Sequence, residues 1–520
     1  MKFKKYLLLL FLDIALIYLY CILSRYWTIY GGVSSNLYKA EIPILLFIVN
    51  ILRPWKEKVS YKYFIPYFYM LALYCIYDFY QKILKRIPIA SDLNEIDALY
   101  TVDPNSVVIG AVLLTLIIFS FIFLLYWNSK GIKSFFYKSL SVFALIFILS
   151  TSAFQKYCEG FFYKSSWDTS GRIKKNGRIM SIFQKHFEMN KNFKKLSSSN
   201  NNKSIKSNED FLPTTKLNFY LVVLESYIDP RKFDLPEKVI NEINSKIPKM
   251  NFDLFTSPAF GGSTVKTEFE LLTGHPSLGL VNTHEFNIMK GSPISSWVTN
   301  LKKNGYFLRL VHGAHSGFYN GLKAYESMGF DLENHHYLWE WDKYHYRKRE
   351  QVFDGDIFDE ALKFISSDLK NKNKLFTYIK GMYGHIPLWR DLKKRPNLVS
   401  FPDVPRIEKM INQFIYRTVA LDKFIKKLSV IDPNSFVIVV SDHLPSLHSL
   451  GKYEYQDDKY SNIYLSYFKG EQVHLNLEKL YELPVKLNKL VNDKSMTLAS
   501  KKELKESYMK LLWESIQSNI

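Results

Sequence analysis

The sequence predicts two structural parts: a helical membrane region followed by an α/β domain. The first 155 residues contain five long apolar runs, whereas from residue 214 onward short apolar runs alternate with helical patterns. Apolar residues make up 47% of the 520 residues and aromatic residues 16%, enough to bury a core, so a wholly disordered chain is excluded. The chain has three cysteines and none after residue 158, which excludes a disulfide scaffold.

The five apolar runs are predicted to be transmembrane helices, because a helix needs about 20 mostly apolar residues to cross a bilayer. They cover residues 6–24, 38–53, 63–81, 106–127 and 134–153. The first run lacks a small-residue cleavage site, so we expect a retained anchor rather than a signal peptide. Residues 1–155 are therefore predicted to form a bundle of about five membrane helices.

The positive charges predict the orientation of these helices. Lys and Arg cluster at the N-terminus, in loop 54–62 and in loop 128–133, and such clusters favour the cytoplasm. An odd number of spans then places everything after residue 155 outside. The formal charge of +20 suggests a face near anionic lipid, and the outward orientation argues against a nucleic-acid partner.

A basic juxtamembrane segment and flexible linker are predicted over residues 156–213. The segment ends in LSSSNNNKSIKSNED, a low-complexity run with almost no apolar residues. The third predicted segment, residues 214–520, is the α/β domain.

Four short apolar runs are predicted to be buried strands of a parallel or mixed sheet, over 219–224, 306–311, 375–380 and 436–441. Helical patterns lie between them at 264–274, 355–368 and 404–428, which indicates helices packed on the sheet. Residues 470–520 are predicted to form amphipathic helices that cover the sheet or close the domain.

Polar residues follow each of the four predicted strands. Since ligands bind outside the carboxyl ends of strands in open α/β sheets, we expect these residues to form one polar site. They are Glu225, His312 with His315, His385, and Asp442 with His443.

The adjacent Asp442 and His443 are candidate metal ligands, and Glu225 supplies a second carboxylate. A carboxylate with an imidazole suits Zn²⁺ or Mn²⁺, whereas Mg²⁺ and Ca²⁺ prefer oxygen ligands alone. The alternatives are a loop cap for Asp442 and a buried ion pair for Glu225.

A candidate nucleophile lies in the segment GGST, where Ser263 or Thr264 precedes a helical pattern. The free N–H groups and the dipole at a helix N-terminus favour an anion there. The alternative is plain helix capping by one of these two residues.

Five segments resemble, in order and spacing, a family of membrane phosphotransferases. They are LVVLESY (221–227), GGSTVKTEFELLTG (261–274), HGAHSGFYNGLKAYESMGF (312–330), YIKGMYGHIPL (378–388) and VVSDHLPS (439–446). The family is the lipoteichoic acid synthase, phosphoglycerol and phosphoethanolamine transferase group of the sulfatase-like superfamily. The resemblance implies the alkaline-phosphatase fold for the catalytic domain, after typically five membrane spans.

The resemblance also implies roles for individual residues. Glu225, Asp442 and His443 match the family's metal ligands, Thr264 matches its catalytic, metal-bound threonine, and His385 matches the catalytic histidine that assists at the substrate phosphate. The cofactor implied is one or two divalent ions, Mn²⁺ or Zn²⁺ before Mg²⁺.

The segment after the second predicted strand departs from lipoteichoic acid synthases. His312, His315 and Tyr319 are the candidate substrate-binding residues, with Tyr319 in place of a tryptophan. Ala314 and Gly321 stand where those synthases carry an acidic residue and an arginine. The departures favour phosphoethanolamine or another head group over polyglycerol phosphate.

The function implied is a metal-dependent phosphotransferase of the bacterial inner membrane, with its catalytic domain facing the periplasm or cell exterior. A phospholipid would donate its phosphoethanolamine or phosphoglycerol head group through a phospho-threonine to a cell-envelope glycan, a lipid-linked glycan or lipopolysaccharide. A phosphodiesterase or phosphatase that uses water, and a non-catalytic envelope protein, are the alternatives. A true sulfatase is disfavoured, because the α/β domain has no cysteine and no Ser-x-Pro-x-Arg motif.

Overall fold

The computed structural model describes residues 211–517 except 214–215, 279–283, 345–350, 387, 446, 448–452 and 494–499. Before residue 211 it describes mainly 131–151 and 177–184, with scattered shorter pieces. The chain divides into two compact units, Met1–Lys194 and Lys195–Ile520. The three predicted segments, with a linker over 156–213, stay a prediction.

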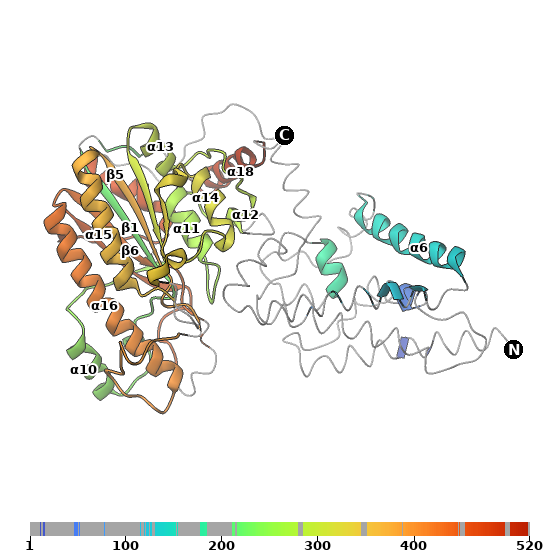
Figure 1. Cartoon of the computed structure of the whole chain (residues 1–520), viewed down its shortest axis with the longest axis horizontal. Helices are drawn as coiled ribbons and strands as arrows, with labels where there is room; N and C mark the ends of the chain where they lie inside the picture. Colours follow the sequence, from blue (N-terminus) through green and yellow to red (C-terminus); the bar gives the residue numbers. More distant parts are fainter. Residues whose placement is uncertain are drawn as a thin grey trace. The chain divides into compact units, whose positions relative to one another are not determined.

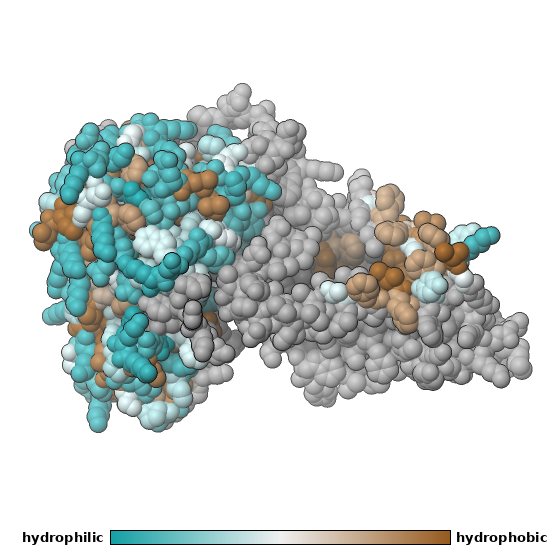
Figure 2. All heavy atoms as spheres, in the orientation of Figure 1, coloured by the Kyte–Doolittle hydropathy of each residue, from teal (hydrophilic) through white to brown (hydrophobic). Residues whose placement is uncertain are grey.

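In the first unit, most residues of the predicted spans 6–24, 38–53, 63–81 and 106–127 lie outside the described residues. The fifth coincides with helix α6 (Ile132–Ser150), whose visible surface is largely hydrophobic in Figure 2. In the part of the chain that the structure describes, none of the helices has both the length and the apolar character that a membrane crossing requires.

The second unit contains a mixed eight-stranded sheet with the path β2-β7-β6-β1-β5-β3-β4, and β8 pairs with β7 (Figure 1). The four predicted strands are confirmed as β1 (Asn218–Leu224), β3 (Phe307–His312), β5 (Leu375–Gly381) and β6 (Ser435–Ser441). Sequence reasoning missed β2 (Asp253–Thr256), β4 (His335–Tyr337), β7 (Ser461–Phe468) and β8 (Glu471–Gln472). Three of these are very short, and β7 mixes polar with apolar residues.

The four predicted strands are neighbours in the order β6-β1-β5-β3, and every pair among these neighbours is parallel. Their carboxyl ends therefore meet at one edge of the sheet. The antiparallel strands β7 and β2 extend the sheet beyond β6. This arrangement brings together the loops in which the polar site was predicted.

Helices cover both faces of the sheet (Figure 1). One face carries α15 (Asp354–Asn371) and α16 (Pro405–Ile431), with α10 (Glu237–Lys246) beside α16. The other carries α11 (Thr264–Thr273), α13 (Trp297–Lys303), α14 (Gly321–Ser327) and α18 (Lys501–Gln517). Helices α12 (Glu285–Ile288) and α17 (Leu483–Asn492) complete the set, with 3₁₀ turns at Pro230–Lys232, Phe318–Asn320, Leu332–Asn334, Leu338–Glu340, Asp342–Tyr344 and Leu480–Glu482.

Side chains of the central strand β5 alternate between the two helical layers, as they must in a pleated strand. Ile379 belongs to the apolar core beneath α15 and α16. Phe376 packs edge-on against Trp297 of α13, with ring centroids 5.6 Å apart, and the Tyr378 hydroxyl donates to Glu268 of α11. The same alternation places the side chain of Lys380 on the α11 side.

Helix α11 also carries a buried carboxyl group at its far end, away from the predicted site. Glu270 is 3% exposed, and its Oε1 accepts a hydrogen bond from the N–H of Ser277 at 3.0 Å. Its Oε2 has no hydrogen-bond partner among the described residues. Burial, together with the carboxylates of Glu285 and Glu482, outweighs the Ser277 N–H and the Lys479 charge and raises the pKa of Glu270 to about 8.

Glu270→Gln should flatten the pH dependence of stability. A raised pKa means that the folded state holds the proton, so this stabilisation is complete below pH about 4.5 and is lost as pH rises to about 8. The wild-type melting temperature should fall across this window, while the neutral amide keeps the variant's curve flatter and its melting temperature higher at pH about 8. Thermal melts at a series of pH values test this, and parallel curves for the two proteins would contradict it.

Candidate functional site

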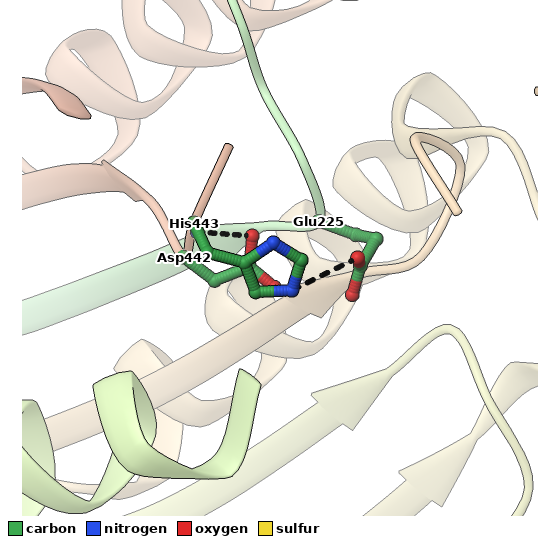
Figure 3. Close-up of side chains that lie close together, drawn as sticks. All are labelled: Glu225, Asp442 and His443. Atoms are coloured by element: carbon green, nitrogen blue, oxygen red, sulfur yellow. Dashed lines mark hydrogen bonds and ion pairs between the residues drawn. The ribbon is translucent and has the colours of Figure 1, made fainter. Parts of the chain in front are cut away.

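Two neighbouring strands deliver three potential ligands to one point (Figure 3). Glu225 directly follows β1, and Asp442 and His443 directly follow β6. His443 Nε2 lies 3.4 Å from Glu225 Oε1 and 3.5 Å from Asp442 Oδ2. One ligand atom of each residue lies within 4.8 Å of the others, and all three residues are buried. The predicted convergence of these loops is thus present.

Hydrogen bonds fix the carboxylate of Asp442. The Oδ1 atom of Asp442 accepts from the backbone N–H groups of Ser226 and His443, both at 2.7 Å. The backbone carbonyl oxygen of Asp442 accepts from the Thr267 hydroxyl at 2.6 Å. Burial by itself would raise the pKa of Asp442, but His443, the Lys380 ammonium and the Ser226 N–H outweigh burial and hold the pKa below its ordinary value. Asp442 is therefore ionised at neutral pH.

The orientation of His443 suits metal ligation. Its Nδ1 lies 3.0 Å from the carbonyl oxygen of Leu444, which can accept only from a protonated nitrogen. A neutral ring with its proton on Nδ1 leaves the lone pair of Nε2 directed at the carboxylates. A backbone carbonyl that holds the other ring nitrogen is the usual support of a metal-bound histidine.

Thr264 is the first residue of α11, and its hydroxyl turns into this group. Its Oγ1 donates to Glu225 Oε2 at 3.0 Å and lies 3.3 Å from His443 Nε2. Ser263, at the N-cap, has a left-handed backbone (φ 71°), and its side chain makes no capping hydrogen bond in this described segment. The capping alternative therefore fits neither residue.

These four side chains fit a divalent cation. Two carboxylates, one imidazole nitrogen and one hydroxyl converge in a buried position, and this donor set suits Mn²⁺ or Zn²⁺. The roles of Glu225, Thr264, Asp442 and His443 as ligands remain predictions from the sequence, which this geometry allows.

Sequence reasoning missed Lys380, near the end of β5. Its Nζ lies 3.3 Å from Asp442 Oδ2 and 3.8 Å from Glu225 Oε2, and its side chain is fully buried. Burial lowers the pKa of Lys380, but the carboxylates of Asp442, Glu268 and Glu225 more than compensate and leave it above its ordinary value. One feature of the sequence could have identified Lys380: it lies inside a strand predicted to be buried on both faces, and a fully buried lysine is rare unless it is paired with an opposite charge.

Arg417 of α16 was missed as well. It donates to the backbone carbonyl of Glu225 at 2.9 Å through one terminal nitrogen and to Asp354 Oδ2 at 2.6 Å through Nε. A Cβ at Gly384 would overlap that same carbonyl oxygen, so only glycine allows the loop after β5 to approach. The close approach places His385, the next residue, beside the backbone of Glu225.

The side chain of His385 lies outside the four-residue group. It is half-buried, and its Nδ1 lies 2.8 Å from the carbonyl oxygen of the next residue, Ile386. Its predicted catalytic role therefore stays a prediction, supported by the position of its loop.

The predicted substrate-binding residues lie at the carboxyl end of β3, where His312 is the last residue of the strand and His315 and Tyr319 follow it. Buried His312 accepts from the N–H of Ala314 through Nδ1, and burial, then the Lys380 charge, lowers its pKa well below the ordinary value. His315 accepts from the N–H of Gly317, and Tyr319 packs edge-on against His284. These contacts leave the predicted binding roles untested.

Asp442→Asn should lower the affinity for Mn²⁺ about 100-fold or more, because it removes a charged ligand. Asp432→Asn is the matched control. Asp432 is also buried, but it accepts from Asn218 and Tyr220 at the amino end of β6, away from the site. Titration calorimetry of the purified chain distinguishes the two variants, and equal affinities would show that Asp442 is not a ligand.

Comparison with known proteins places the second unit in a family. A family model described as Sulfatase matches residues 218–491, more than half of the chain. An uncharacterised protein of Haemophilus influenzae is 32% identical over 135 residues, which cover 25% of this chain and 24% of that protein. A putative cyclic beta-1,2-glucan modification protein of Rhizobium meliloti is 24% identical over 244 residues, or 44% and 36% of the two chains. The chain thus matches about a third of these relatives' length or less.

Among solved structures, the lipoteichoic acid synthase LtaP from Listeria monocytogenes is similar with a TM-score of 0.44 and 18% identity, over 60% of this chain and 81% of that one. The superfamily expected from the five motif segments is confirmed by the family match over residues 218–491. The chain belongs to the sulfatase family.

Proposed function

We propose that this protein is a metal-dependent membrane phosphotransferase. It moves a phospholipid head group, phosphoethanolamine or phosphoglycerol, through a phospho-threonine on Thr264 to a hydroxyl of a cell-envelope glycan or lipopolysaccharide. The observation that carries the proposal is the placement of the Thr264 hydroxyl, 3.0 Å from Glu225 and 3.3 Å from His443 at the N-terminus of α11.

The position of Thr264 suits a nucleophile. A divalent cation held by Glu225, Asp442, His443 and the Thr264 hydroxyl would lower the pKa of that hydroxyl and offset charge on the phosphoryl group. In the described structure the hydroxyl already donates to Glu225 Oε2, which gives its proton a nearby acceptor. The N-terminal N–H groups of α11 favour an anion at the same place.

The first step joins Thr264 to phosphorus and releases the lipid. A bond forms between Thr264 Oγ and phosphorus, the bond from phosphorus to the diacylglycerol oxygen breaks, and the threonine proton passes to Glu225 Oε2, which accepts from that hydroxyl. His385 donates a proton to the departing diacylglycerol oxygen. In the second step an acceptor hydroxyl attacks phosphorus and passes its proton to His385, which lost one in the first step. The bond from phosphorus to Thr264 breaks, and Thr264 regains its proton from Glu225.

The acceptor is proposed to be a glycan or a lipid-linked glycan. The name of the Rhizobium relative, a putative cyclic beta-1,2-glucan modification protein, supports this class of acceptor. His312, His315 and Tyr319, at the same edge of the sheet as Thr264, are proposed to line the substrate site.

A phospholipid donor lies in the membrane, so we expect the enzyme that uses it to be held there. We place residues 1–155 in the bacterial inner membrane as a multi-pass domain, residues 156–213 as a linker, and residues 214–520 in the periplasm or cell exterior. The apolar runs and the charge of +20 support this arrangement.

Thr264→Ala should abolish a covalent adduct that the wild type forms. The purified full chain, incubated with Mn²⁺ and phosphatidylethanolamine or phosphatidylglycerol, should gain the mass of one head-group phosphate, and the mass identifies the group. Ser263→Gly is the matched control: it removes the neighbouring hydroxyl, and its left-handed backbone suits glycine, so the adduct should persist.

Intact-mass spectrometry separates the alternatives. Suppose that the head-group phosphate or inorganic phosphate is released, and that neither the wild type nor the two variants carry an adduct. This result would indicate a hydrolase that uses water as the acceptor. An adduct that survives in Thr264→Ala would overturn the assignment of the nucleophile, and no turnover with bound metal would favour a non-catalytic envelope protein.

His385→Ala should slow turnover by about 10² to 10³, the usual loss when one electrostatic or proton-donating group is removed. The affinity for Mn²⁺ should not change, because His385 lies outside the group formed by Glu225, Asp442, His443 and the Thr264 hydroxyl. Steady-state kinetics beside calorimetry tests this, and a large loss of metal affinity would instead make His385 a ligand.

A further inference from the structure

We propose that the buried ammonium of Lys380 is an internal counter-ion, which holds Glu225 and Asp442 in position before a metal binds and competes electrostatically with that metal. The inference rests on the metal site of the proposed function. It assigns a positioning role to a residue that the motifs left unassigned.

The geometry makes Lys380 a shared partner of the two carboxylates. Its Nζ lies 3.3 Å from Asp442 Oδ2 and 3.8 Å from Glu225 Oε2, the oxygen that also accepts from Thr264. Lys380 pairs with Val223 of β1 on one side and His312 of β3 on the other, so the sheet holds its backbone rigidly. The strand register therefore fixes the lysine beside the two carboxylates.

Burial makes this charge important. Burying an isolated carboxylate raises the free energy of the folded protein, because the charge loses its hydration. A nearby opposite charge offsets much of this penalty. Lys380, Asp442 and Glu225 have side-chain exposures of 0%, 0% and 4%, so water screens their interaction little. Glu268, on α11, is a third buried carboxyl group that acts electrostatically on Lys380.

Lys380 acts through the ligands rather than on a substrate. Its side chain is fully buried on the α11 side of β5, and its ammonium faces the carboxylates of Glu225 and Asp442. A divalent cation between the same carboxylates would be repelled by the ammonium. Removing the charge should thus destabilise the metal-free protein and strengthen metal binding.

Lys380→Met, which keeps most of the side-chain volume, tests both consequences in the full purified chain. Without metal, its melting temperature should fall by about 5–10 °C, as expected when a buried pair loses one partner. With saturating Mn²⁺ most of this loss should be recovered, and the dissociation constant for Mn²⁺ should fall about tenfold relative to wild type. Differential scanning fluorimetry and calorimetry measure these quantities without any substrate.

Two further variants control for packing. Arg417→Met removes another buried cation. Arg417 binds Asp354 and the backbone carbonyl of Glu225, but not the proposed ligand oxygens. The melting temperature of this variant should therefore fall equally with and without Mn²⁺. Lys380→Arg keeps the charge in a larger side chain, so its affinity for Mn²⁺ should stay near that of wild type even if packing suffers.

The outcomes separate this inference from the proposed function. An equal loss of stability with and without Mn²⁺ in Lys380→Met, with unchanged affinity, would overturn the counter-ion role. So would an affinity change in Lys380→Arg as large as in Lys380→Met. If Lys380→Met folds only when Mn²⁺ is present, the inference is supported. If Mn²⁺ does not change the melting temperature of the wild type, the metal site of the proposed function is wrong.

Discussion

The catalytic half of this protein depends on keeping two carboxylates, Glu225 and Asp442, buried side by side at the edge of a parallel sheet. Such a pair is stable only with compensating groups. The described structure supplies them from several elements: the Lys380 ammonium at the end of β5, the N–H of Ser226, and the Thr264 hydroxyl of α11. The strand order β6-β1-β5 brings these elements together.

The same constraint explains the surrounding loops. Because the carbonyl oxygen of Glu225 points at Arg417, the chain after β1 is tied to α16 on one face of the sheet. The Thr264 hydroxyl ties Glu225 to α11 on the other face. The site is thus held from both helical layers, which places the Thr264 hydroxyl of α11 within hydrogen-bond distance of Glu225, at the end of β1.

Much of the fold was predictable because its central strands are buried on both faces and read as short apolar runs. The polar residues that follow β1 and β6 were predictable for the same reason, since parallel strands end at one edge. Lys380 and Arg417 were harder. Lys380 and Arg417 pair with Asp442 and Asp354, which lie 62 and 63 residues away in the sequence, and both contact Glu225, which follows the distant β1. None of these pairings follows from local spacing. Short edge strands such as β4 and β8 leave almost no periodicity to detect.

The proposed chemistry requires that Glu225, Thr264, Asp442 and His443 surround one divalent cation. Anomalous diffraction at the manganese edge, from crystals of the protein grown with Mn²⁺, tests it most directly. The geometry predicts a peak within about 2.0–2.3 Å of an oxygen or nitrogen from each of the four residues. A fully occupied peak elsewhere, or none beside these residues at saturating Mn²⁺, would contradict the claim.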